Sequence, residues 1–189
     1  MTSQPSLIAY PWLALGLVWL TAAAGKKAVL QRQSTPRRFL HVALGALAFA
    51  LLAYPWFARG WLGMRFVPHT QAVYFTGFGL TVVGALFAIW ARLTLGGNWS
   101  GRPSLMAGHE LITSGPYAFA RHPIYTGLVL AYAGTALADG EWRGVAGLAL
   151  VLLAFLTKMR DEEQIMLRAF PDAYPQYRRR VKALIPGVL

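Results

Sequence analysis

Residues 114–127 read SGPYAFARHPIYTG and lead directly into a long apolar run. Proline is well tolerated in the first turn of a helix, where its missing N–H would be unpaired in any case, so Pro123 predicts a helix that starts near Ile124. The free N–H groups of such a helix end attract anions. Arg121 and His122 stand immediately before it. On this tripeptide alone they are either interfacial anchors of an apolar helix or part of a polar site.

The composition is that of a membrane protein. Of the 189 residues 56% are hydrophobic and 13% are charged, against roughly 25% charged residues in soluble domains. The mean hydropathy is +0.44. The chain contains no cysteine, which excludes disulfides and thiolate metal sites. The net charge of +11 comes from loops between apolar runs, a pattern that favours anionic lipid head groups over nucleic acid.

Five apolar runs predict five transmembrane helices, at residues 7–24, 39–57, 71–90, 124–138 and 142–157. The first run lacks a basic leader, so we interpret it as a span and not as a cleaved signal peptide. The last two runs are short for a bilayer and are joined by Asp139, Gly140 and Glu141. They predict a helical hairpin that borrows flanking residues or stops short of the far surface.

The distribution of basic residues predicts the orientation. Fifteen of the eighteen Lys and Arg residues lie in the loop before residue 39, in the loop 91–123 and in the tail from Lys158, which alternate to one side of the membrane. The opposite side holds Arg59, Arg65 and Arg143. By the positive-inside rule we expect the N-terminus outside and the C-terminus in the cytosol.

We predict one membrane domain over residues 1–189. Residues 1–90 supply three spans, and residues 91–189 supply a long loop, the hairpin and a C-terminal segment. In the tail, apolar residues recur at helical spacing, so we expect the fifth helix to continue past the apolar run and the tail then to fold back along the membrane surface. The apolar residues at this spacing are Ile165, Met166, Leu167 and Phe170.

A second polar motif, RDEE at residues 160–163, follows the fifth apolar run. The hairpin should bring Glu162 close to His122, although 40 residues separate them. Acids are disfavoured at a helix C-terminus, and a surface pair of Lys158 with Glu162 would explain only one of them. Aromatic residues lie in or beside the same two segments, as interfacial anchors or as walls of a pocket that binds a cation: Trp99, Tyr117, Tyr125, Tyr174 and Tyr177. Together these groups fit a zwitterionic ligand.

The stretches HELITSGPYAFARHPIYTGLVLAYAGTALA and KMRDEEQIMLRAFPDAYPQYRRRVKALIP resemble the isoprenylcysteine carboxyl methyltransferase family, which is related to the phospholipid methyltransferases. The resemblance covers about residues 92–186 and rests on the Arg-His-Pro motif followed by the Glu-Glu pair. It implies an all-α integral membrane enzyme that uses S-adenosylmethionine, held in a cytosolic pocket that the C-terminal segment closes. It also implies a lipid-like substrate that enters from the bilayer. Phe170-Pro171 stands where the family has Phe-Gly, which affects the shape of the closing segment.

Residue by residue, the resemblance implies a cofactor site and a catalytic pair. Arg160 and Glu163 would face the reacting group, and Glu162 would hold the polar end of the cofactor or of the substrate. His122 and Tyr125 would contact S-adenosylmethionine. The pocket walls would be Leu111, Ile112, Gly115 and Tyr117.

The chemistry of the acceptor stays open at this stage. A carboxylate is already an anion and needs only positioning, by Arg160, whereas an amine, thiol or phenol would need Glu163 or His122 as a base. A phospholipid N-methyltransferase and a non-catalytic membrane assembly or haem-handling protein are the alternatives. The four histidines show no metal-ligand spacing. The run GFGLTVVG from Gly77 to Gly84 lies inside a predicted span and favours close helix packing over a dinucleotide loop.

Overall fold

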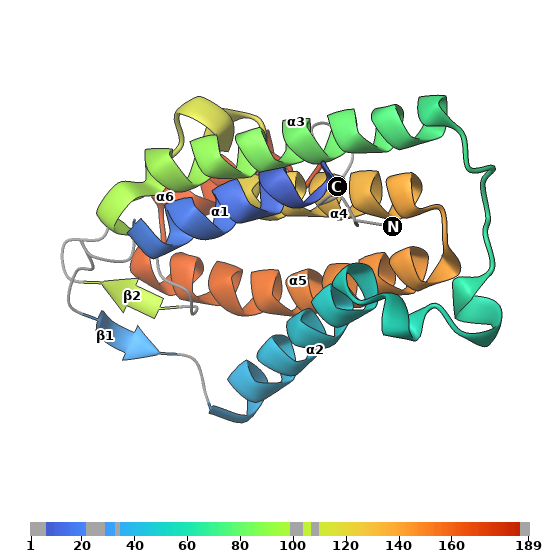
Figure 1. The fold of residues 1–189 in the computed structure, drawn as a ribbon. Helices are drawn as coiled ribbons and strands as arrows, with labels where there is room; N and C mark the ends of the chain where they lie inside the picture. Colours follow the sequence, from blue (N-terminus) through green and yellow to red (C-terminus); the bar gives the residue numbers. More distant parts are fainter. Residues whose placement is uncertain (1–6, 22–28, 33–34, 99–103, 107–109, 186–189) are drawn as a thin grey trace.

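The computed structural model describes residues 7–21, 29–32, 35–98, 104–106 and 110–185. Helices dominate this part of the chain, as the sequence predicts. They are α1 (Ala9–Thr21), α2 (Thr35–Ala53), α3 (Gln71–Leu95), α4 (Pro123–Asp139), α5 (Trp142–Ala169) and α6 (Ala173–Arg180), with four short 3-10 turns, Pro55–Phe57, Gly60–Gly63, Gly96–Asn98 and Gly115–Ala118. Figure 1 shows α3, α4 and α5 side by side, with α1 against α3 and α2 crossing α5 at an angle.

The predicted hairpin is formed by α4 and α5. Pro123 is the first residue of α4, and Gly140 ends that helix in the left-handed conformation at φ 68°, which glycine adopts without steric cost. The turn is tight because α5 begins again at Trp142. α5 then runs 28 residues to Ala169, so the fifth helix borrows the charged residues after the apolar run and the tail does continue it.

Glycines bring α3 and α4 into backbone contact. A Cβ built on Gly84 would lie 2.5 Å from Ala131 N and Gly127 O, and one on Gly77 would lie 2.5 Å from Ala138 N and Gly134 O. These close glycine contacts form a seam between α3 and α4, and they recur every seven residues on both antiparallel helices. Small residues of this kind let helix backbones approach closely inside a membrane, where apolar burial does not drive association. The interpretation of Gly77 and Gly84 as packing residues is confirmed.

Polar side chains at the seam between α3 and α4 also form hydrogen bonds that hold α1 against it. The hydroxyls of Thr81 and Thr135 lie 3.1 Å apart, and the Trp12 indole N–H donates to the Thr135 hydroxyl at 3.0 Å. α2 packs against α5 at Gly147, where a Cβ would lie 2.9 Å from Ala48 O. The first three helices and the hairpin therefore form one bundle.

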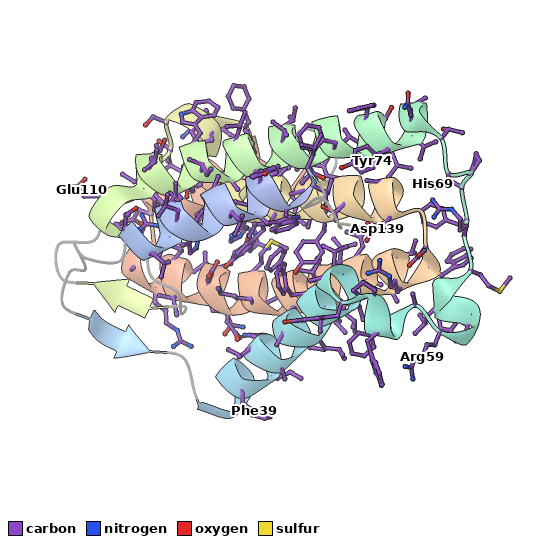
Figure 2. The ribbon with its side chains drawn as sticks, in the orientation of Figure 1. Phe39, Arg59, His69, Tyr74, Glu110 and Asp139 are labelled. Carbon is purple, nitrogen blue, oxygen red and sulfur yellow. The ribbon has the colours of Figure 1, made fainter. Side chains whose placement is uncertain are left out.

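The loops pair at the two ends of this bundle. β1 (Val29–Arg32) and β2 (Ser104–Met106) form an antiparallel two-stranded ladder, which the sequence did not predict. At the other end an isolated bridge joins Arg65 and Glu141. Figure 2 shows Glu110 at one end of the bundle and Arg59 and His69 at the other. Each of these pairings joins two loops that the distribution of basic residues predicts on the same side of the membrane.

Within the described residues, two helices, Gln71–Leu95 and Trp142–Ala169, are long and apolar enough to cross a bilayer, and Ala9–Thr21 and Phe39–Ala53 are shorter apolar helices. Large apolar side chains point outward from the bundle: Leu13, Leu17, Leu20, Phe39, Val42, Phe75, Val83 and Leu86 are 45% or more exposed. An outward apolar belt is costly in water and favourable in lipid. The chain has the surface of a membrane protein.

The α3–α4 seam predicts opposite effects for two glycines of α3. Gly84→Ala would press its methyl group on the α4 backbone and should destabilise the protein by about 1–3 kcal/mol. Gly79→Ala is the matched control, because a Cβ at Gly79 meets nothing within 4 Å, and it should be neutral or stabilising by up to about 1 kcal/mol. Thermal unfolding in detergent, followed by circular dichroism, measures both. Equal melting temperatures for the two variants would contradict the seam.

Candidate active site

The start of α4 and the charged end of α5 meet at one point, as the hairpin predicts. His122 caps α4, and its Nδ1 lies 3.5 Å from Glu162 Oε2, while its Nε2 lies 3.5 Å from Glu163 Oε1. The imidazole is 9% exposed. Nε2 is buried and makes no hydrogen bond within the described part of the chain. An imidazole held between two acids is the centre of the site.

Arg121 connects Glu163 to the C-terminal segment. Its Nε donates to Glu163 Oε1 at 2.9 Å and its Nη2 to the same oxygen at 2.5 Å. Its Nη1 donates to Val181 O at 2.5 Å and lies 3.3 Å from Arg178 O. The guanidinium is 8% exposed. The five donors of arginine suit this bridging position.

Tyr125 lies in the first turn of α4 and orients the other acid. Its hydroxyl donates to Glu162 Oε1 at 2.6 Å. Its ring stacks on the His122 ring at 5.6 Å and on Phe155 at 4.5 Å between centroids, and Lys158 Nζ lies 5.4 Å from its centroid. The stack runs from the apolar part of α5 to the imidazole, so it joins the cluster to the apolar part of the bundle.

The residues after α6 form a strap, residues 181–185, across the start of α4. Arg121 N donates to Lys182 O at 2.8 Å and His122 N to Ala183 O at 2.9 Å. The Thr126 hydroxyl donates to Leu184 O at 2.7 Å. These bonds satisfy backbone groups that a helix start leaves unpaired. The tail therefore folds back on the Arg-His-Pro motif.

α6 anchors the strap through two buried tyrosines, Tyr174 and Tyr177, each 3% exposed. The Tyr177 hydroxyl donates to Tyr117 O at 2.6 Å, and the Tyr117 hydroxyl lies 3.4 Å from Ala91 O on α3. A chain of contacts thus runs from the tail through the 3-10 turn at Gly115–Ala118 to α3. Tyr117, Tyr174 and Tyr177 are buried, and their role as walls of a pocket stays a prediction. Trp99 lies outside the described residues.

The charges of the cluster favour its ionised form. His122, Glu162 and Glu163 lie outside the apolar stretches of their helices. The apolar stretch of α4 begins after Pro123, and that of α5 ends at Thr157. Burial alone would lower the pKa of His122, but the two carboxylates outweigh burial and raise it. Burial would raise the pKa of Glu163, but His122 and Arg121 outweigh it and lower that pKa to about 2. The pKa of Glu162 is lowered for the corresponding reason, with His122 as the largest opposing contribution. These contacts therefore favour the imidazolium form of His122 and the ionised form of both acids.

The remaining residues named from the sequence lie around this cluster to different degrees. Tyr117 is buried, Ile112 packs on the hydrophobic cluster that contains Tyr117 and Tyr125, and Leu111 is half-buried. Gly115 takes φ 58° and lies against Thr94. Arg160 is exposed. The bonds to Glu163 come from Arg121, a residue for which the sequence predicted no role beyond its motif.

Known proteins with similar sequences place these motifs in a family. A family model described as phospholipid methyltransferase matches residues 72–173. The protein-S-isoprenylcysteine O-methyltransferase of Schizosaccharomyces pombe is 37% identical over 79 residues, covering 41% of this chain and 34% of that protein. The human protein of the same name is 30% identical over 116 residues, covering 60% of this chain and 41% of that protein.

A relative with a different name matches over a longer stretch. The cobalt-zinc-cadmium resistance protein CzcN of Cupriavidus metallidurans is 30% identical over 127 residues, covering 67% of this chain and 53% of that protein. Among solved structures, that of a eukaryotic intramembrane Ras methyltransferase, ICMT, aligns with a TM-score of 0.53 at 23% identity, covering 84% of this chain and 55% of that one. This agreement concerns the fold alone. The chain spans about a third to a half of the length of these sequence relatives.

The matched region contains both motifs of the site, Arg121-His122-Pro123 and the acids at 162 and 163, and it covers more than half of the 189 residues. The fold neighbour supports the same arrangement of helices. On these grounds the chain belongs to the phospholipid methyltransferase family.

Proposed function

We propose that the chain is a membrane methyltransferase that uses S-adenosylmethionine and acts on an amphipathic acceptor at the inner face of the bilayer. The observation that carries the proposal is the buried contact of His122 with Glu162 and Glu163, at 3.5 Å to each acid. A purely structural salt bridge would leave no buried donor without a partner. Here His122 Nε2 is buried and makes no hydrogen bond within the described residues, although Glu163 Oε1 lies 3.5 Å away.

The cluster fits the charges of this cofactor. S-adenosylmethionine carries two positive centres and one carboxylate, and the site combines two ionised acids with a protonated imidazole. Glu162, fixed by the Tyr125 hydroxyl at 2.6 Å, would hold a positive centre. His122 Nε2 would donate to an acceptor oxygen, and Leu111, Ile112, Gly115 and Tyr117 would form the apolar walls. When bound, the cofactor supplies an electrophilic methyl group, and the protein supplies orientation and exclusion of water.

The protonation states favour an acceptor that is already an anion. A general base works best with a pKa near the operating pH. Glu163, with a pKa of about 2, is too weak a base to remove a proton from an amine, and the raised pKa of His122 favours its imidazolium form, which is not a base. A carboxylate needs no base, and the exposed Arg160 would position it. We therefore place O-methylation of a lipid-like carboxylate first, in line with the names of several relatives.

We also propose the five-span topology, with the N-terminus outside and the site on the cytosolic side. The β1–β2 ladder supports it, because that ladder joins the two loops that the basic residues assigned to the cytosol. The Arg65–Glu141 bridge supports the opposite assignment for the other loops. α1 and α2 are short, and tilted packing with local thinning of the bilayer accommodates short spans.

Cofactor binding tests the proposal directly. Purified protein in detergent should bind S-adenosylhomocysteine by calorimetry, and Glu162→Gln should weaken binding by at least about tenfold, because the charge is lost while the acceptor for Tyr125 remains. Asp172→Asn is the matched control, since Asp172 is exposed and its side chain caps nothing. Failure of the wild-type protein to bind, with its fold intact, would overturn the proposal.

The charge of His122 predicts a pH dependence of stability. Its pKa is raised above the ordinary 6.5, so the stabilisation from its contacts with the two acids is fully present below about pH 6.5 and disappears as pH rises through the folded-state pKa. The difference in melting temperature between wild type and His122→Gln should therefore shrink toward alkaline pH. A difference that grows as the pH rises would contradict a protonated imidazole.

A second candidate follows from the name of the family model. A phospholipid N-methyltransferase would accept an ethanolamine head group, whereas the charges of this site favour a carboxylate. Transfer of a labelled methyl group should proceed to a prenylated cysteine or a comparable amphipathic carboxylate and not to phosphatidylethanolamine. The reverse preference would assign the chain to N-methylation and leave the cofactor site unchanged.

A further inference from the structure

The outer side of α6 and the strap carries a dense set of positive charges. Residues 173–185 contain no acidic residue, and four basic residues in this segment are exposed. We call them the basic surface: Arg178, Arg179, Arg180 and Lys182. The inner side of α6 is occupied by Tyr174 and Tyr177, both buried. The helix therefore has one side fixed in the protein and one charged side turned outward.

The strap fixes the basic surface at the level where the bundle becomes apolar. Lys182 O and Ala183 O accept from the backbone of Arg121 and His122, and the apolar helix α4 begins at the next residue, Pro123. The basic surface is thus held a few residues from the position at which α4 enters the apolar layer. On a freely solvated tail, a cluster of charges would have no fixed position relative to the apolar layer.

Exposed apolar side chains flank the same place. Phe119 is 55% exposed and Ile185 is 51% exposed, one just before the Arg-His-Pro motif and one at the end of the strap. Cations with neighbouring exposed apolar groups are the composition of a segment that lies in a lipid head-group layer. Arg178 contributes to the active site as well, because its Nε lies 3.5 Å from Glu163 Oε2.

We propose that the basic surface docks on anionic head groups of the adjacent bilayer leaflet and so holds the strap against Arg121 and His122. An anionic leaflet attracts clustered Lys and Arg near the surface, within about one Debye length. Because the strap is hydrogen-bonded to Arg121 and His122 themselves, lipid binding at the basic surface would act on the site through these bonds. The occupant is a bilayer of anionic phospholipid, and the inference does not depend on methyl transfer.

Hydrogen exchange of the full chain in lipid nanodiscs tests the proposal. Backbone amides of residues 173–185 should exchange about tenfold more slowly in nanodiscs of phosphatidylcholine with phosphatidylglycerol than in phosphatidylcholine alone. High salt should remove the difference. The variant Arg179→Gln/Arg180→Gln/Lys182→Gln, which keeps Arg178 at Glu163, should exchange at the same rate in both lipids.

A matched control distinguishes docking of this surface from a general effect of lipid charge on the protein. Arg59→Gln removes a cation at the opposite end of the bundle, where its guanidinium lies 3.6 Å from the Trp56 ring centroid, and it should retain the lipid effect. Equal exchange of the wild type in both lipids would show a merely solvated charged face. Slowing by inorganic phosphate in phosphatidylcholine discs, to the extent seen with phosphatidylglycerol, would indicate a small-anion site instead. Either outcome overturns the proposal. Both are measured on the wild-type protein, so they decide the question even if the triple variant fails to fold.

Discussion

The ion cluster of Arg121, His122, Glu162 and Glu163 is the constraint on which the rest of this end of the molecule depends. Taking four ionisable groups out of water is costly, and removing one partner from such a set leaves a buried charge uncompensated. The cluster is stable only while three separate segments meet: the start of α4, the charged end of α5 and the strap. Each segment supplies groups that the other two leave unsatisfied.

The glycine seam between α3 and α4 makes that meeting possible. In lipid, apolar surface gives little reason for helices to associate, so close packing and interhelical hydrogen bonds must do so. Gly84 and Gly127 bring the two backbones together, and α4 is thereby fixed against a long, stiff helix. The position of His122 at the first residue before α4 then follows from packing many residues away. The hairpin turn at Gly140 sets where α5 returns.

The sequence predicted the parts of this arrangement that depend on local pattern. Hydrophobic runs located the apolar helices, Pro123 located the start of α4, and the hairpin placed Glu162 beside His122, which the 3.5 Å contact confirms. It did not predict the β1–β2 ladder, because short strands in long loops form by tertiary pairing and carry no period of their own. It also did not predict that Arg121 would bond Glu163, since a guanidinium with five donors has many partners within reach. The Arg-His-Pro motif was the only available signal for that residue.

The electrostatics of the cluster and the proposed chemistry depend on one another. Glu163, whose pKa His122 and Arg121 lower to about 2, accepts charge-assisted hydrogen bonds and attracts cations, but it is a poor base. In the proposed enzyme, this arrangement would hold a positively charged donor and present it to a nucleophile that arrives already charged. Raising the pKa of Glu163 toward neutrality would require loss of its contacts with His122 and Arg121. That same guanidinium holds the strap through Val181 O, so a site adapted to deprotonate its acceptor could not keep this closure unchanged.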